Sequence, residues 1–320
     1  MNNLIQPDIY TFGAGFILEQ VAQFEAEIDG TLFSNDIEYV HRMRVASRRM
    51  HTGLRLFNKF LPENYGEKWL GEMKGITRAL GNARDLDVQI QFLQLECQGD
   101  LSERYKPGYE HLLLRLTQLR ANTQQEVNST IHTLQRNQIF EEILDVLKGA
   151  RIEDNDFYSP SLYELAQRAI NKALTVFLSY HDIIQDPNNS EKLHQMRIAG
   201  KRLRYTMEIF RPLYREAIDP LIDVMKGIQD QLGDIHDCDV WIAWLSEFIR
   251  QEQSRIMANS SETRSLEKIL PGIRHLIEDR TQNRCTEYGA FIANWQGLVR
   301  EQTWVKLRQI IQATGAEFEL

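Results

Sequence analysis

Two blocks of this chain occur twice, and this repetition limits the fold more than any other feature of the sequence. The first block reads HRMRVASRRMHTGLRLF (41–57) and recurs without a gap as HQMRIAGKRLRYTMEIF (194–210), 153 residues later. The second reads MKGITRALGNARDLDV (73–88) and recurs as MKGIQDQLGDIHDCDV (225–240), with 9 of 16 residues identical and an offset of 152. Two matched blocks in the same order, at nearly equal offsets, indicate two copies of one unit.

The positions of the blocks predict the domain organisation. We place the two copies at residues 8–150 and 158–310, which together form one domain over 8–310, with a C-terminal tail at 311–320. The join between the copies reads ARIEDNDFYSPS (150–161) and has the acids, serines and proline of a linker or surface loop. At 320 residues the chain is long enough for one large domain or two of ordinary size.

Each copy reads as a set of helices. Residues with N-cap chemistry precede both copies of the first block, in SNDI (34–37) and DPNNSEKL (186–193). Prolines follow both copies, in LPENYG (61–66) and RPLYREAIDP (211–220), where they favour a helix end. Hairpin dipeptides between alternating apolar runs are missing from the sequence. We therefore predict an all-α protein of two pseudo-symmetric antiparallel bundles, with about four to six helices each.

Glycines and acids in the second block suggest helix boundaries. Gly81 and Gly233 stand where a helix C-cap would, and each is followed by a segment that could start a new helix. The acids that recur in both copies are Asp85, Asp87, Asp237 and Asp239. We interpret them as N-terminal caps of that new helix, and positioning of a basic side chain is the alternative.

Positive charge is concentrated in the first block, although the chain is acidic. The net charge is −8, yet residues 40–61 carry a local charge of +6 with no acid, and residues 191–211 carry +4. The remainder of the chain therefore holds −18. A polyanion partner would be repelled at long range but attracted by these two segments.

Helical geometry gathers the basic residues onto one face in each copy. At about 100° per residue, the basic side chains of each block fall within a stripe of about 80°. The first stripe comprises His41, Arg44, Arg48, His51 and Arg55, and the second comprises His194, Arg197, Lys201 and Arg204. Arg49 and Arg202 lie on the flanks. The opposite faces carry Met43, Met50, Leu54 and Phe57, and Met196, Leu203, Met207 and Phe210.

A solvated helix face is the simplest explanation of such a stripe. Solvated faces normally mix both signs, however, because like charges at i and i+4 cost stability. Arg44 with Arg48 forms such a like-charged pair, and it recurs as Arg197 with Lys201. The repetition favours an anion-binding face in each copy. Lys74 and Lys226 also recur and either extend this surface or are solvated lysines.

The two equivalent histidines fit the same chemistry. A histidine is mostly neutral near neutral pH unless an anion raises its pKa, so His41 and His194 would act as conditional donors to phosphate. Neither stripe places a Cys, Asp or Glu beside its histidine, so we predict no metal site and no cofactor. The His-Asp pair in DIHDCDV (234–240) suggests a metal-dependent phosphohydrolase, but His236 aligns with Arg84, which is not a metal ligand.

The remaining sequence features point to the cytoplasm. Cys97, Cys238 and Cys285 are widely spaced and form neither a disulfide framework nor a zinc motif. The N-terminus lacks the basic region of a secretory signal, and apolar runs of about 18 residues are missing, so we expect no membrane association.

The paired His-x-x-Arg-x-x-x-(Arg/Lys)-Arg blocks, together with LGNARDLDV and LGDIHDCDV, resemble the CHAD family, the conserved histidine α-helical domain. The resemblance covers essentially the whole chain. It implies two four-helix-bundle-like halves related by a pseudo-twofold, whose basic surface converges on a central cavity or pore and binds inorganic polyphosphate. Family members are commonly fused to a triphosphate-tunnel (CYTH) catalytic domain, but no such sequence accompanies this chain, so we expect a stand-alone member.

The resemblance carries over to individual residues. The basic positions that match the family are His41, Arg44, Arg48, Arg49, Arg55, His194, Arg197, Lys201, Arg202 and Arg204. His51 departs from the pattern, because the family usually has arginine there, as this chain has at Arg204. With His51, Lys74 and Lys226 these positions form the predicted polyphosphate site.

We predict non-enzymatic binding of polyphosphate by a cytoplasmic protein, in association with polyphosphate granules. Nucleic acid is the less favoured partner, because Tyr205 is the sole aromatic residue within the stripes. An enzyme acting on phosphoanhydrides would need a carboxylate-held metal beside the basic face. A scaffold that docks an acidic protein is the remaining alternative.

Overall fold

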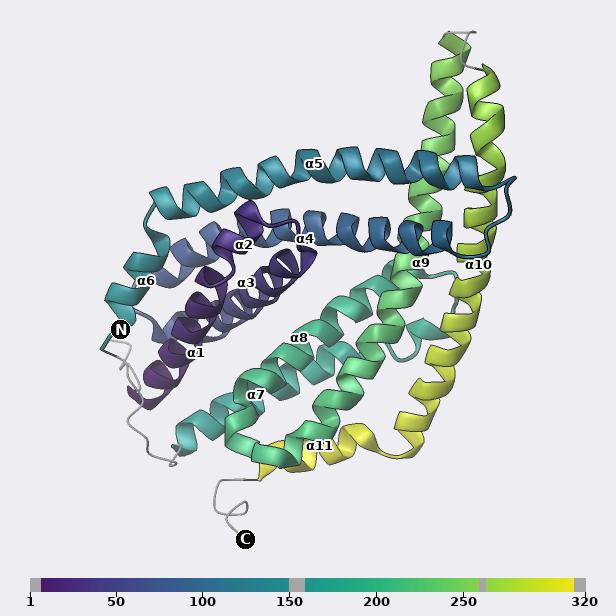
Figure 1. Ribbon diagram of the computed structural model, residues 1–320. Helices are drawn as coiled ribbons and strands as arrows, with labels where there is room; N and C mark the ends of the chain where they lie inside the picture. The colour runs from purple at the N-terminus through teal and green to yellow at the C-terminus, as the bar shows by residue number, and fades with distance from the viewer. Residues whose placement is uncertain (1–6, 150–158, 259–262, 314–320) are drawn as a thin grey trace. The chain divides into compact units, whose positions relative to one another are not determined.

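The computed structural model describes residues 7–149, 159–258 and 263–313, which form helices joined by short loops and contain no β-strand. The predicted all-α fold class is therefore confirmed. The helices in Figure 1 are α1 (Pro7–Glu25), α2 (Ile28–Phe33), α3 (Ile37–Phe57), α4 (Tyr65–Gln98), α5 (Lys106–Arg136), α6 (Ile139–Leu147), α7 (Pro160–Leu178), α8 (Ser190–Tyr214), α9 (Asp219–Ala258), α10 (Thr263–Arg300) and α11 (Thr303–Gln312). Short 3₁₀ turns lie at Asn58–Phe60, Ile183–Gln185 and Arg215–Ile218.

The described residues divide between two compact units. The first unit holds those within 7–91 and 116–169, and the second holds those within 92–115 and 170–313. Helices α4, α5 and α7 each contribute to both units. The sequence boundaries of the two copies stay a prediction, and most of the join at 150–161 lies outside the described residues.

In the first unit α3 packs its apolar face into the core. Met43, Met50 and Leu54 are fully buried, in one cluster with Trp69 and Met73 of α4. Complete burial of a side chain of this size is worth about 1.5–3 kcal/mol, which outweighs the modest helix preference of any single residue. The apolar face predicted from helical spacing is therefore the buried face, and the basic residues of α3 lie away from this core.

Both basic helices begin at the predicted capping residues. The side chain of Asp36 accepts a hydrogen bond from the backbone N–H of Glu38, and that of Asn189 accepts one from Lys192. Each cap satisfies one of the backbone donors that a helix start leaves unpaired. Helix α8 continues past Pro212 and ends at Tyr214, within the segment predicted to end it.

The predicted helix boundary inside the second block is wrong. Helices α4 and α9 run unbroken through Gly81 and Gly233, so neither glycine is a C-cap. A Cβ on Gly81 would lie 3.9 Å from Arg44 Nε, and one on Gly233 would lie 3.9 Å from Arg197 Nε. These are ordinary van der Waals distances, and they place an arginine of the preceding helix against this part of each helix. Tertiary packing here outweighs the helix-breaking tendency of glycine.

The four recurring aspartates therefore lie inside helices and are not caps. They are Asp85 and Asp87 of α4 and Asp237 and Asp239 of α9. The capping interpretation assumed that a new helix starts after Gly81 and after Gly233. Because α4 and α9 continue through these glycines, no helix starts there.

In the second unit the ends of α4 and α5 pack against α9 and α10, which run side by side (Figure 1). The ring of Tyr105 stacks on His275, with centroids 4.1 Å apart. Helices α5 and α10 approach at two glycines, where a Cβ on Gly108 would lie 2.8 Å from the Cα of Gly272 and 2.5 Å from the carbonyl oxygen of Ile269. Glycine is required at this crossing because no side-chain carbon fits.

Candidate functional site

The basic side chains of helix α3 differ in their exposure to solvent. Arg44, Arg48 and Arg49 are half-buried and Arg55 is exposed, while the opposite face of the helix is buried. Arg44 extends to α4, where its Nη2 lies 3.6 Å from Asp85 Oδ1. The carboxyl side chain is 72% exposed, so this ion pair is loose and solvent-screened. The geometry leaves the stripe accessible to a ligand from solvent.

His51 marks the centre of the positive charge on this face. Burial lowers the pKa of His51, and Arg55, Arg48 and Lys74 lower it further, in that order. Lys74 of α4 is exposed, and it has no ion pair with the described residues. Cations of two helices therefore act on one histidine, and the assignment of Lys74 to the polyphosphate site stays a prediction.

His41 lies at the start of the same face, near Arg84, which was not among the predicted site residues. Burial lowers the pKa of His41, Arg84 contributes next, and Glu38 opposes them. Arg84 extends from α4 with its Nη1 3.4 Å from Glu38 Oε1. The Nδ1 atom of His41 is buried and accepts or donates no hydrogen bond among the described residues. Arg84 thus joins the site and helps to keep His41 neutral.

In the second unit a second histidine occupies the corresponding place. His194 Nδ1 lies 3.1 Å from His236 Nδ1, with ring centroids 4.2 Å apart. Burial lowers the pKa of His236 to about 4, and Arg197, His194 and Lys201 add to the shift. The pKa of His194 is also lowered, mainly by burial and Arg197. A hydrogen bond between two Nδ1 atoms needs one donor and one acceptor, so this contact requires at least one neutral ring.

In the second unit two predicted site residues, Arg204 of α8 and Lys226 of α9, have carboxylate partners on their own helices. Arg204 donates to Glu208 at 2.6 Å and to Gln229 at 2.9 Å, and its guanidinium lies 4.8 Å from the ring centre of Tyr205. Lys226 of α9 pairs with Asp223 at 2.7 Å. Arg197 and Lys201 are half-buried and Arg202 is exposed. Two of the predicted site residues, Arg204 and Lys226, are therefore held by carboxylates of their own helices.

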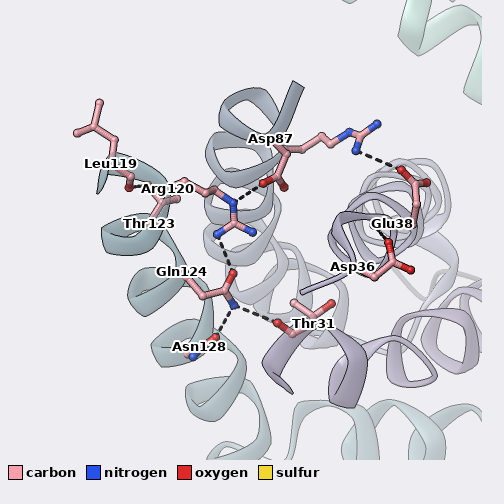
Figure 2. A network of polar contacts seen from close by, with 10 residues as sticks. Thr31, Asp36, Glu38, Asp87, Leu119, Arg120, Thr123, Gln124 and Asn128 are labelled. Atoms are coloured by element: carbon pink, nitrogen blue, oxygen red, sulfur yellow. Dashed lines mark hydrogen bonds and ion pairs between the residues drawn. The ribbon is translucent and has the colours of Figure 1, made fainter. Parts of the chain in front are cut away.

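The recurring aspartates position arginines that no sequence pattern had identified. In Figure 2, Arg120 of α5 donates from Nε to Asp87 Oδ1 at 2.6 Å and from Nη1 to Gln124 at 2.7 Å. Gln124 in turn donates to the carbonyl oxygen of Thr31 at 3.0 Å, in the segment that leads into α3. The network ties α2, the helix before the basic helix α3, to α4 and α5.

A similar contact serves α8. Arg284 of α10 donates from Nε to Asp239 Oδ1 at 2.5 Å and from Nη2 to the carbonyl oxygen of Pro187 at 2.8 Å. Pro187 precedes α8 by a few residues. Asp87 and Asp239 therefore position a basic side chain, which was the alternative interpretation. Arg120 and Arg284 lie outside the matched blocks, so the sequence comparison carried no signal for them.

Metal-binding clusters and membrane-spanning helices are both missing from the residues that the structure describes. Among them, no group of three or more His, Cys, Asp or Glu side chains is arranged to hold a metal ion. No described helix combines the length and the apolar character needed to cross a membrane.

Comparison with solved structures finds the same fold in two proteins. The CHAD domain from the plant Ricinus communis aligns with a TM-score of 0.66 and 17% identity, over 89% of this chain and 91% of that one. PptA from Streptomyces chartreusis aligns with a TM-score of 0.61 and 16% identity, over 90% of this chain and 99% of that one. At these identities the likeness shows the fold alone.

Comparison of sequences adds the family. An uncharacterized protein of Mycobacterium tuberculosis, matched in strains CDC 1551 and H37Rv, is 26% identical over 218 residues, which cover 65% of this chain. The match spans 40% of the length of these relatives. The family model described as CHAD domain matches residues 15–246. The chain therefore belongs to the CHAD domain family, which is associated with polyphosphate binding.

Proposed function

We propose that this protein binds inorganic polyphosphate, without cleaving it, through the basic, histidine-containing faces of α3 and α8. The observation that carries the proposal is the positive charge on this face: Arg55 of α3 and Lys74 of α4 are exposed, and both, with Arg48, act on His51. The association of the family with polyphosphate supports the same ligand.

The chemistry of the side chains suits a chain of phosphates. Arginine presents a planar fork of donors that matches phosphate oxygens, and successive arginines on one helix face are about 5.4 Å apart per turn. Release of counterions from a highly charged polymer would supply much of the affinity. The neutral histidines add donors when a bound anion raises their pKa.

Nucleic acid fits this surface less well. Sequence-tolerant binding of single strands depends on aromatic side chains on which bases stack. Tyr205, the sole aromatic residue of the basic stripes, is 8% exposed and lies under the guanidinium of Arg204. The ring therefore offers no face to a base. Docking of an acidic protein, the scaffold alternative, remains an outcome of the binding test.

The test is calorimetric titration of the protein with long-chain polyphosphate, triphosphate, orthophosphate and a single-stranded RNA of matched charge. We expect polyphosphate to bind tightest, with an affinity that falls steeply as salt rises. A variant with Arg44, Arg48, Arg197 and Lys201 all changed to Ala should lose binding and keep its helical circular dichroism. Equal affinity for polyphosphate and orthophosphate would contradict the proposal.

A matched control separates a specific surface from net charge. Arg136, Arg300, Lys306 and Arg308 are exposed cations on α5, α10 and α11. Their replacement with Ala removes the same four charges and should leave binding nearly unchanged. Equal losses in the two variants would mean that binding follows net charge and uses no particular face.

The absence of catalysis is tested separately. We expect no orthophosphate release from polyphosphate or from triphosphate when magnesium or manganese is added. Orthophosphate release that co-purifies with the protein and rises in proportion to its concentration would overturn the non-enzymatic part of the proposal. We further propose a cytoplasmic location at polyphosphate granules, which co-localisation of a fluorescent fusion with stained granules tests.

A further inference from the structure

The two matched copies differ in charge at equivalent positions. Residues 41–57 and 73–88 carry eight Arg and Lys against two Asp, a formal charge of +6. Residues 194–210 and 225–240 carry five Arg and Lys against five acids, a formal charge of zero. The blocks align residue by residue, so this difference does not come from different lengths.

The difference is concentrated on one face of α4 and of α9. We define the α4 stripe as Gly71, Lys74, Arg78, Gly81, Asn82 and Asp85, and the α9 stripe as Asp223, Lys226, Asp230, Gly233, Asp234 and Asp237. Each set falls within about 100° of helix surface. Gly81 contacts Arg44 and Gly233 contacts Arg197, so each stripe faces the basic helix of its own unit. The α4 stripe is net positive and the α9 stripe is net negative.

The carboxylates of the second unit lie close to its cations. Lys226 pairs with Asp223 on α9, and Arg204 pairs with Glu208 on α8. The charge of Arg197 acts on Asp234, whose pKa is nevertheless raised by burial and by neighbouring acids, among them Glu287 of α10. Negative charge therefore surrounds Arg197 as well as Arg204 and Lys226.

The first unit lacks these partners at the equivalent positions. Arg55 stands where the second unit has Glu208, and Arg78 stands where it has Asp230. Gly71 replaces Asp223, so Lys74 has no acid one turn before it. Within the described part of the chain, Arg55, Lys74 and Arg78 form no ion pair.

We infer that the two faces are unequal, and that the polyphosphate is held by the α3–α4 face while the α8–α9 face, neutralised by its own carboxylates, contributes little. This inference rests on the proposed function. A phosphate that approaches α8 must compete with carboxylates already bound to the cations, and it meets further carboxylates along α9. A phosphate that approaches α3 meets Lys74 and Arg78 along the α4 stripe, in which Asp85 is the single acid.

Two triple variants at equivalent positions test the inference in the full-length chain. The first changes Arg48, Arg49 and Lys74 to Gln, and the second changes Lys201, Arg202 and Lys226 to Gln. Both remove three charges. In titrations with long-chain polyphosphate we expect the affinity to fall about tenfold or more in the first variant and less than about threefold in the second. Each cation that contacts a phosphate releases about one counterion, so loss of such contacts lowers the affinity. Circular dichroism checks that both variants keep their helices.

A third variant makes the second face resemble the first. Asp223→Asn combined with Asp230→Arg changes two exposed side chains of α9 to match the charge at Gly71 and Arg78. We expect tighter binding and a steeper salt dependence, a gain that misfolding does not produce. Equal losses in the two triple variants, or no gain in the third, would overturn the inequality and leave the proposed function intact. A parent protein that binds no polyphosphate would overturn both.

Discussion

His194 Nδ1 lies 3.1 Å from His236 Nδ1, at the contact between α8 and α9. Burial, Arg197, His194 and Lys201 together lower the pKa of His236 to about 4 from its ordinary value of 6.5. Helix α3 has a different arrangement, because Arg84 stands at the position equivalent to His236. The histidine pair is thus a feature of the second unit, and its protonation opposes folding.

The pair predicts that acid weakens the fold. Below about pH 6.5 the unfolded chain binds a proton at His236 that the folded chain excludes until about pH 4, so the free energy of unfolding falls as pH falls through this window. Urea denaturation midpoints at several pH values measure the effect. His236→Gln should flatten the pH dependence, whereas His132→Gln, on an exposed histidine of α5, should not. The same slope in both variants would contradict the prediction.

The ion pair of Asp87 and Arg120 predicts a large difference between neighbouring aspartates. Asp87 is 4% exposed and Arg120 is 15% exposed. Removal of one partner of a buried pair leaves the other charge uncompensated, which costs about 3–5 kcal/mol. Asp87→Ala should therefore destabilise strongly in urea denaturation. The control is Asp85→Ala, on a loose and exposed ion pair, which should cost less than about 0.5 kcal/mol.

Substitution of two glycines should have opposite effects on stability. Gly108 lies at the crossing of α5 and α10, whereas Gly71 lies on the exposed surface of α4. Gly108→Ala places a carbon 2.5 Å from the carbonyl oxygen of Ile269 and should cost about 1–3 kcal/mol through overpacking. Gly71→Ala places a carbon in open space inside α4 and should stabilise by about 0.5–1 kcal/mol, because alanine favours helix. Thermal denaturation reports both signs. A stable Gly108→Ala variant would show that the helices separate at little cost.

Polyphosphate binding should be coupled to proton uptake. Burial lowers the pKa of His41, and Arg84, Arg44 and Arg42 lower it further, with Glu38 opposing them. Burial also lowers the pKa of His51, and Arg55, Arg48 and Lys74 add to the shift. Both rings are therefore neutral at about pH 7, and a bound polyanion favours their protonation. Affinity should rise as pH falls from about 7.5 to about 6.

Calorimetry in buffers of different ionisation enthalpy measures the number of protons taken up on binding. His41→Gln combined with His51→Gln should reduce that number and flatten the pH profile of affinity. The control is again His132→Gln. Binding with no net proton uptake would mean that the histidines take no part in holding the anion.

Local sequence determined a large part of this protein. The matched blocks located the basic helices, Asp36 and Asn189 marked their first residues, and the spacing of Met43, Met50 and Leu54 identified the buried face of α3. These features follow from backbone geometry. A helix fixes which residues share a face, and its first N–H groups have no acceptor within the helix, so a nearby side chain accepts their hydrogen bonds. Such information is contained within a few turns of chain.

Tertiary structure decided the partners of the charged residues. Gly81 resembled a helix end, yet α4 continues through it, and Arg44 of α3 lies beside it. Asp87 resembled a cap, yet it holds Arg120, 33 residues away. Whether a cation faces solvent, as Arg55 does, or a carboxylate, as Arg204 does, depends on which helices pack together. Such contacts join residues far apart in the chain, and packing of the whole domain sets them, so no local pattern encodes them.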